Sequence, residues 1–324
     1  MVEQSLNKPV IGITIGDAAG IGPEIVLKAL KDVQTACRFV IIGDAVHLRV
    51  LAEDLNVEID PLTTEIFDLK NLPGHFTMGV DAAVTGKASA ENIETAVKLW
   101  RERKIDAICT APISKKAIHL GGYDFRGHTE LLANLTGTQE FAMSFFADKL
   151  RVVLLSTHLS LIDAIALVKK DSLIDLIKFS AGELAKLLGR DVSIAVAGLN
   201  PHASEGGMFG SEEQNEIIPA IDHCRSLGIN VSGPFAPDTI FLRAYKGDFD
   251  GVIALYHDQA TIAVKSLSFG SGVNVTLGLP LIRTSVDHGT AYDIAGKGVA
   301  EASSMVGAIK LAAELAHSRK FAEI

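Results

Sequence analysis

The sequence predicts an α/β protein in which mostly parallel strands are flanked by helices. Short apolar runs, of the kind that form buried strands, alternate along the chain with amphipathic segments that have a helical period. Hydrophobic residues make up 48% of the 324 residues and aromatic residues only 6%, so aliphatic side chains must fill the core. That balance favours helices packed on parallel strands over a β-sandwich or a disordered chain.

The predicted elements occur along the whole chain. In order, the apolar runs read VIGITIG at 10–16, RFVIIGD at 38–44, IDAICTA at 105–111, LRVVLLST at 150–157, VSIAVAGL at 192–199, DGVIALY at 250–256 and VNVTLGL at 273–279. Apolar residues that return every three or four positions predict helices, most clearly over 88–104 and 172–189. Pro23, after a glycine-rich turn, marks another helix start, and His128 and Thr129 stand at the start of a further one.

The bulk chemistry argues against several classes of partner. The formal net charge is −9 and the chain has no basic run, which argues against nucleic-acid binding. No apolar run approaches the roughly 20 residues that a membrane span requires, so we expect a soluble, cytoplasmic protein with no membrane partner. Cys37, Cys109 and Cys224 lie far apart in the sequence, and we expect them to be reduced.

Three of the predicted strands lead into a histidine: His158, His202 and His257. In an open parallel sheet, ligands gather at the carboxyl ends of strands, so three imidazoles there can converge on Zn²⁺, Co²⁺ or a similar ion. Alternatively they are ordinary hydrogen-bonded loop histidines, because the wide spacing lacks the specificity of an HExxH motif. Asp258 either orients a histidine ligand or caps a turn.

Several long motifs closely resemble those of one enzyme family. They read ITIGDAAGIGPEI, GGYDFRGHTELLA, YHDQATIAVK, SGVNVTLG and LIRTSVDHGTAYDIAGKG, in the same order as in the 4-hydroxythreonine-4-phosphate dehydrogenase family. The resemblance implies a two-domain fold similar to isocitrate and isopropylmalate dehydrogenases, with the active site in the interdomain cleft. It also implies a homodimer whose active site is shared between subunits. The expected domains are 1–127 together with 263–324, and 128–262, which carries metal ligands and dimer contacts.

The resemblance implies a specific reaction. Members oxidise the C3 hydroxyl of 4-phosphohydroxy-L-threonine with NAD and a divalent metal, then decarboxylate the product to 3-amino-2-oxopropyl phosphate for pyridoxal phosphate biosynthesis. A branch of the family acts instead on 4-phospho-D-threonate or 4-phospho-D-erythronate and gives dihydroxyacetone phosphate and CO₂. Ala18 and Ala260 depart from the common family motifs, and the sequence leaves open whether C2 of the substrate carries an amine or a hydroxyl. Functions of another class are a metal-dependent lyase or phosphatase, or a phosphometabolite-binding protein.

The resemblance also assigns site residues. The metal, Zn²⁺, Co²⁺ or Mg²⁺, would be held by His158, His202 and His257. The substrate would be held by His128, Thr129, Lys265, Asn274 and Arg283. Arg283 can grip a phosphate or carboxylate through a bidentate fork, and Lys265 supplies a point charge. Lys265 and Asp258 are the catalytic candidates. Taken singly, Thr129 would be interpreted as a helix cap, Asn274 as part of a strand turn and Arg283 as a solvated surface charge.

The cofactor loop is predicted from a second likeness. GDAAGIGPE is not the GxGxxG fingerprint of a Rossmann fold. DHGTAYDIAGKGVA, however, is similar to the loop that holds the adenosine of NAD in isopropylmalate dehydrogenases. On that likeness His288, Ala291 and Asp293 would contact NAD, or alternatively NADP, with Asp293 at the ribose. Tyr292 replaces the usual proline, and a glycine-rich loop shaped only for packing is the alternative.

Overall fold

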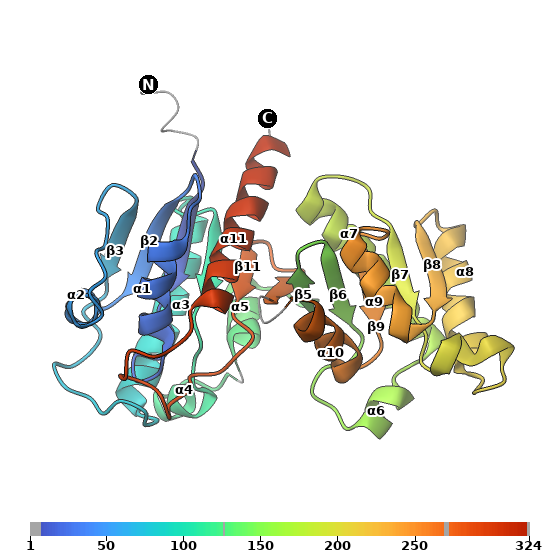
Figure 1. The fold of residues 1–324 in the computed structure, drawn as a ribbon, viewed down its shortest axis with the longest axis horizontal. Coiled ribbons are helices and arrows are strands. Elements are labelled where there is room, and N and C mark those ends of the chain that lie inside the picture. The colour runs from blue at the N-terminus through green and yellow to red at the C-terminus, as the bar shows by residue number, and fades with distance from the viewer. Residues whose placement is uncertain (1–7, 126, 269–271, 323–324) are drawn as a thin grey trace. The chain divides into compact units, whose positions relative to one another are not determined.

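The computed structural model describes residues 8–125, 127–268 and 272–322. The chain forms an α/β protein of two compact units, Met1–Gln139 with Leu279–Ile324, and Glu140–Gly278 (Figure 1). In both units helices flank a mostly parallel sheet, which confirms the predicted fold class. The unit boundaries differ from the expected ones at 127/128 and 262/263, because residues 128–136 pack within the first unit and residues 263–268 pack within the second.

The first unit is a parallel sheet with helices on both faces. Its strands are β1 (Val10–Thr14), β2 (Arg38–Gly43), β3 (Thr64–Asp68), β4 (Ala107–Thr110) and β11 (Ile282–Ser285). Its helices are α1 (Gly22–Asp32), α2 (Ala45–Asp54), α3 (Ala83–Arg101), α4 (Lys115–Leu120), α5 (His128–Thr136) and α11 (Ser303–Ala322). The strand order is β3-β2-β1-β4-β11, and every neighbouring pair is parallel.

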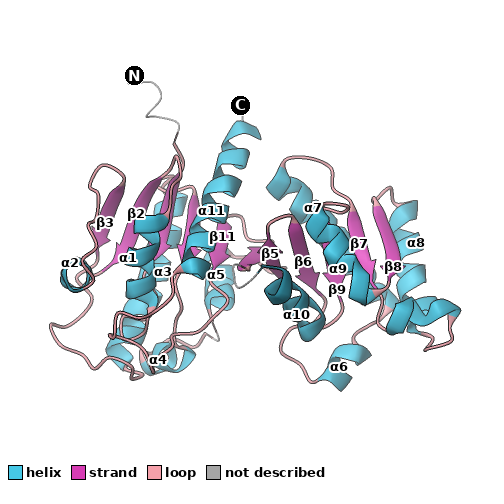
Figure 2. Cartoon of the chain, in the orientation of Figure 1, coloured by secondary structure: helices cyan, strands magenta, loops and turns pink. Residues whose placement is uncertain are grey.

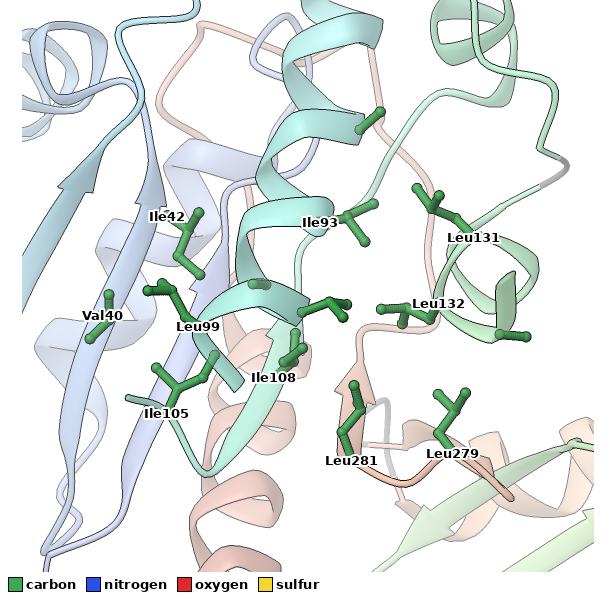
Figure 3. Packing of buried hydrophobic residues seen from close by; sticks show 14 residues of the cluster. Val40, Ile42, Ile93, Leu99, Ile105, Ile108, Leu131, Leu132, Leu279 and Leu281 are labelled. Carbon is green, nitrogen blue, oxygen red and sulfur yellow. The ribbon is translucent and has the colours of Figure 1, made fainter. Parts of the chain in front are cut away.

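The core of the first unit lies between the sheet and helices α3 and α5. Ile42 of β2 and Ile108 of β4 meet Ile93 of α3 in this core (Figure 3). Leu131 and Leu132 of α5 extend the same cluster. Helices α1 and α11 cover the opposite face of the sheet (Figure 1). Because full burial of such an aliphatic side chain contributes about 1.5–3 kcal/mol, this core holds the ends of β4 and β11 and the start of α5 in fixed positions.

The remaining strands lie in the second unit. Its strands are β5 (Ala142–Ala147), β6 (Leu150–Leu154), β7 (Ile194–Ala197), β8 (Val231–Phe235), β9 (Gly251–Ala254) and β10 (Val273–Leu277). Its helices are α6 (Leu161–Ala166), α7 (Lys170–Leu188), α8 (Ile218–Ser226), α9 (Pro237–Lys246) and α10 (His257–Ser268), with a 3₁₀ turn (Pro201–Gly206) and a π-helical turn (Glu213–Ile217). The order is β10-β5-β6-β9-β7-β8, with β5 antiparallel to β10 and β6 and the other pairs parallel.

Helices also cover both faces of the strands in the second unit (Figure 2). Phe241 of α9 and Val264 of α10 pack with Val252 of β9 in one buried cluster. On the other face, a Cβ atom added to Gly251 would lie 2.7 Å from Cδ1 of Leu184 in α7. The strand therefore needs glycine at this position to let α7 approach closely.

The predicted runs and helices agree with the structure. Each of the seven apolar runs contains a strand, namely β1, β2, β4, β6, β7, β9 and β10. The predicted helices at 88–104 and 172–189 correspond to α3 and α7. Strands β3, β5, β8 and β11 lie outside the predicted runs. Over the part of the chain that the structure describes, none of the helices combines the length and apolar composition needed to cross a membrane.

All three cysteines are buried. Cys109, on β4, is fully buried, and this burial raises the pKa of its thiol to about 12. The thiol is therefore protonated at neutral pH and is a packing group rather than a nucleophile.

Two glycines within helices are expected to affect stability in opposite directions when they are replaced by alanine. In α3, a Cβ atom on Gly86 would lie 1.8 Å from the carbonyl oxygen of Ala117, whereas a Cβ atom on Gly182 in α7 would meet nothing within 4 Å. We expect Gly86→Ala to lower the free energy of unfolding by about 1–3 kcal/mol through overpacking. Gly182→Ala should instead raise it by about 0.5–1 kcal/mol, because alanine is the better helix former. Urea denaturation of both variants measures the two signs, and a stabilised Gly86→Ala protein would contradict the α3–α4 packing.

Candidate active site

The three predicted histidine ligands follow three neighbouring parallel strands of the second unit. β6, β9 and β7 are adjacent, with Val152 paired to Val252 and Val252 paired to Ala195. Parallel pairing brings the carboxyl ends of these strands to the same edge of the sheet. His158 follows β6, His202 follows β7, and His257 is the first residue of α10, after β9.

His158 and His257 lie close together. Their ring centroids are 5.9 Å apart, and both side chains reach solvent. Nδ1 of His257 lies 2.7 Å from Oδ1 of Asp258. Because the carboxylate contacts Nδ1, it fixes the ring and leaves Nε2 for another partner, which is the usual arrangement of a metal-binding histidine. Asp258 is therefore placed to orient His257.

His202 stands in a strained turn. Residues 202–205 take φ values between 46° and 63°, in the left-handed region that non-glycine residues rarely adopt. The buried carboxylate of Glu213 supports the start of this turn, because Oε1 accepts hydrogen bonds from the backbone nitrogens of Leu199 at 2.8 Å and Asn200 at 2.7 Å. Such strain persists only where surrounding contacts impose it, and it is common at functional sites.

The structure brings together two of the three histidines. Among the described residues, no three His, Cys, Asp or Glu side chains gather within reach of a common metal ion. The ring of His202 lies against Phe209, with centroids 6.4 Å apart. The donor chemistry of the His158–His257 pair nevertheless fits Zn²⁺ or Co²⁺, because both ions accept neutral imidazole and one ring is already oriented by a carboxylate.

Lys265 and Asn274 also lie in the second unit. Lys265 is exposed on α10, roughly two helical turns after His257, so the two side chains leave neighbouring faces of the helix. Asn274 is half-buried on β10, paired with Phe145 of β5. Asn274 therefore stands within a strand rather than in a turn.

Arg283 and Thr110 form a buried hydrogen-bonded pair in the first unit. Arg283 is on β11 and is only 4% exposed, and Thr110 ends the adjacent strand β4. Nε and one terminal nitrogen of Arg283 donate to the Thr110 hydroxyl at 3.2 and 3.0 Å. Burial lowers the pKa of Arg283 to about 10, so the side chain remains a cation at neutral pH. A guanidinium that keeps its charge at such a position can bind a phosphate or carboxylate through charge-assisted hydrogen bonds.

Sequence reasoning missed Thr110. Its signal is a hydroxyl residue at the end of the apolar run IDAICTA, beside the strand that carries an arginine. The pairing of β4 with β11 was not visible in the sequence, because β11 lies far along the chain from β4.

His128 begins α5, as predicted. Its Nε2 atom is buried and has no hydrogen-bond partner among the described residues. Burial, together with the nearby charge of Arg283, holds the pKa of His128 well below its usual value, so the ring is neutral. Thr129 is the next residue of the helix, and Gly127, not Thr129, is the N-cap. An unsatisfied ring nitrogen near a buried guanidinium is suited to contact an anion.

The three predicted cofactor residues share one loop of the first unit. Nδ1 of His288 lies 3.1 Å from the carbonyl oxygen of Gly289. Ala291 has a φ of 43°, and Asp293 is exposed. An exposed carboxylate on a loop of defined conformation is a suitable acceptor for ribose hydroxyl groups. The donor and acceptor chemistry of this loop therefore fits a dinucleotide.

Comparisons with known proteins cover nearly the whole chain. A family model described as "Pyridoxal phosphate biosynthetic protein PdxA" matches residues 35–312. A D-threonate 4-phosphate dehydrogenase of Cupriavidus necator is 46% identical over 96% of this chain and 98% of that protein. A 4-hydroxythreonine-4-phosphate dehydrogenase of Desulforapulum autotrophicum is 46% identical over 95% of each chain. A crystal structure of a 4-hydroxythreonine-4-phosphate dehydrogenase from Burkholderia phymatum matches with a TM-score of 0.83 at 44% identity, covering 95% of this chain and 98% of that one.

The lowered pKa of His128 predicts a specific acid sensitivity. Below about pH 6.5 the unfolded chain binds a proton at this histidine that the folded protein does not bind. The contribution of His128 to stability is therefore complete above that pH and is lost as the pH falls, by at most about 1.4 kcal/mol per pH unit. We expect His128→Gln to flatten the fall in unfolding free energy between pH 6.5 and 5, measured by urea denaturation. His223→Gln, at an exposed histidine of α8, is the control. An unchanged slope in His128→Gln would show that the ring titrates normally.

Proposed function

Because the chain belongs to the PdxA family of dehydrogenases, we propose that it oxidises a four-carbon 3-hydroxy acid phosphorylated at C4, with NAD and a divalent metal, and then releases CO₂. The first candidate substrate is 4-phosphohydroxy-L-threonine, which would give 3-amino-2-oxopropyl phosphate. The second is 4-phospho-D-threonate, because the relative named for D-threonate 4-phosphate is as similar to this chain as the relative named for 4-hydroxythreonine 4-phosphate. We place the reaction in the cytoplasm, with NADP as the alternative cofactor.

The observation that carries this proposal is the buried pair of Arg283 and Thr110 near His128. The guanidinium would bind the phosphate or carboxylate of the substrate, and Nε2 of His128 would add a hydrogen bond to the same group. A hydrogen bond to a charged group contributes about 1.5–3 kcal/mol. Thr129, Asn274 and Lys265 are the other residues that we assign to substrate binding, the first two through polar contacts and Lys265 through its charge.

The metal would be held by the histidines at the carboxyl ends of β6, β7 and β9. The pairing of His158 with His257 and the contact of His257 with Asp258 support this assignment. A divalent ion held there would stabilise the negative charge that develops on substrate oxygens during oxidation and decarboxylation. His202 would complete the ligand set across a dimer, in which the two subunits share ligands.

An exposed apolar segment supports the homodimer. Helix α6, just after His158, exposes Leu161 by 58% and Ile162 by 81%, and Leu159 before it is 50% exposed. Apolar side chains grouped in this way on a surface mark an interaction site. We propose that a second copy of the chain covers this segment, which would bring another subunit close to His158.

Three side chains would take separate roles during turnover. Lys265 would exchange the proton of the C3 hydroxyl, or hold the substrate by its charge, as hydride leaves C3 for the nicotinamide. Asp258 would keep the His257 ring in one orientation during turnover. His128, neutral because its pKa is lowered, would hold the anion without competing for the proton.

An assay with three candidate substrates tests the proposed reaction. NAD⁺ reduction, followed by absorbance, should occur with at least one of 4-phosphohydroxy-L-threonine, 4-phospho-D-threonate and 4-phospho-D-erythronate, and one equivalent of CO₂ should be released per NADH. The preferred substrate decides whether C2 carries an amine or a hydroxyl. Release of inorganic phosphate or CO₂ without NADH would favour a metal-dependent phosphatase or lyase. Binding of the substrates without turnover would favour a phosphometabolite-binding protein.

Metal removal tests the histidine assignment. Chelation should abolish NADH formation, and Zn²⁺, Co²⁺ or Mg²⁺ should restore it. His257→Ala should lose both bound metal and turnover, and Asp258→Asn should bind metal about 10- to 100-fold more weakly, because the ring loses its orienting carboxylate. His223→Ala, at an exposed histidine outside the site, is the control. A His257→Ala protein that contains no metal by elemental analysis yet turns over at the wild-type rate would refute the assignment.

A further inference from the structure

The glycine-rich motif GDAAGIGPE at residues 16–24 contains none of the proposed metal ligands and none of the residues proposed to bind the substrate. The structure places it in the turn from β1 to the first residues of α1. It lies against the loop of residues 288–300, which carries the predicted cofactor residues. The contacts between these two segments indicate what the motif does.

Backbone contacts join the turn to the first half of the loop. The backbone nitrogen of Ile21 donates to the carbonyl oxygen of Thr290 at 2.9 Å. A Cβ atom on Gly20 would lie 2.9 Å from the same oxygen, so this approach requires glycine. Gly79 contacts both segments. Its backbone nitrogen donates to the carbonyl oxygen of Ala19 at 2.7 Å, and a Cβ atom on Gly79 would lie 2.6 Å from the carbonyl oxygen of Tyr292.

Side chains of α1 hold the second half of the loop. Glu24 is only 2% exposed, and its Oε1 atom accepts a hydrogen bond from the backbone nitrogen of Ala300 at 2.8 Å. Lys28 pairs with the same Glu24 oxygen at 2.8 Å and donates to the carbonyl oxygens of Gly298 and Ala300, each at 2.9 Å. The loop is therefore attached to the motif and to α1 near both of its ends.

The centre of the loop is held by a buried carboxylate. The hydroxyl of Tyr292 donates to Oδ2 of Asp17 at 2.8 Å, and Oδ1 of Asp17 accepts from the backbone nitrogen of Ala19 at 2.9 Å. Asp17 is fully buried. One carboxylate thus connects the glycine-rich turn to the residue that lies between Ala291 and Asp293.

We propose that Asp17 and Tyr292 are a positioning pair for cofactor binding: they hold the loop in the conformation that presents Ala291 and Asp293 to the dinucleotide. The inference rests on the proposed function, because it assumes that this loop binds NAD. Ala291 has a left-handed φ of 43°, a conformation that a non-glycine residue keeps only when neighbouring contacts impose it. A loop ordered before binding loses less conformational entropy when the ligand arrives, which increases affinity.

Tyr292 stands at a position where the similar loop of isopropylmalate dehydrogenases has a different residue. Where the isopropylmalate dehydrogenase loop has a proline, which restricts φ by its ring, this chain has Tyr292. The tyrosine restricts the loop through a side-chain hydrogen bond instead. GDAAGIGPE therefore supports the loop that carries the predicted cofactor residues.

Tyr292→Phe tests the pair, because it removes only the hydroxyl. Tyr123→Phe is the matched control: Tyr123 lies in the same unit, and its hydroxyl contacts a carboxylate oxygen of Glu94 at 3.4 Å, away from the loop. In the full-length protein, Tyr292→Phe should raise the calorimetric Kd for NAD⁺ about tenfold. It should also speed amide hydrogen exchange in residues 288–300 and leave the KM for the phosphorylated acid unchanged. Tyr123→Phe should change none of these quantities.

The outcomes separate this inference from the proposed function. If wild-type protein binds NAD⁺ and Tyr292→Phe binds it with the same Kd, the positioning role is wrong while the dehydrogenase proposal stands. If wild-type protein does not bind NAD⁺, the proposed function fails and the inference fails with it. Should Tyr292→Phe not fold, Asp17→Asn, which keeps the shape of the acceptor but removes its charge, should raise the same Kd, and an unchanged value would overturn the proposal.

Discussion

Parallel pairing of neighbouring strands is the constraint on which both groups of candidate site residues depend. In a parallel sheet every carboxyl end lies at one edge, so residues far apart in the sequence become neighbours there. In the second unit, the adjacency of β6, β9 and β7 brings His158 and His257 within 5.9 Å of each other. In the first unit, the pairing of β4 with β11 brings Thr110 to the guanidinium of Arg283. Without these strand pairings, the same residues would lie far apart in space as well as in the sequence.

The buried polar groups of the first unit define what it can bind. Arg283 keeps its charge despite burial, and His128 is kept neutral by the same burial and by the nearby guanidinium. One cation and one neutral ring therefore favour a single anionic group over a cationic or apolar one. The neighbouring loop of residues 288–300 is held by the side chains of Asp17, Glu24 and Lys28, so the part of the unit proposed to bind the dinucleotide is also ordered by polar side-chain contacts.

Strands were predictable where burial on both faces makes the sequence continuously apolar. β1, β2 and β9 show this signal, because each is covered by helices on both sides. β3 and β8 are edge strands with partly exposed side chains, and β11 carries the polar residues Arg283 and Thr284, so none of the three shows it. The expected domain boundary before His128 followed from the resemblance to the family and not from a signal in the sequence itself. Packing decided otherwise: α5 belongs with α3 through Leu131 and Leu132.

The sequence by itself determined the α/β class, the family and the identity of the candidate residues, because apolar periodicity and long motifs are local properties of the chain. Only the tertiary structure decided which residues are neighbours: the His158–His257 pair, the Thr110 support of Arg283, and the contact of Tyr292 with Asp17. The lowered pKa of His128 likewise comes from burial and from a charge on a distant strand, and neither can be read from the residues beside it. Local sequence patterns identify the candidate side chains, whereas strand order and burial determine their neighbours and their charge states.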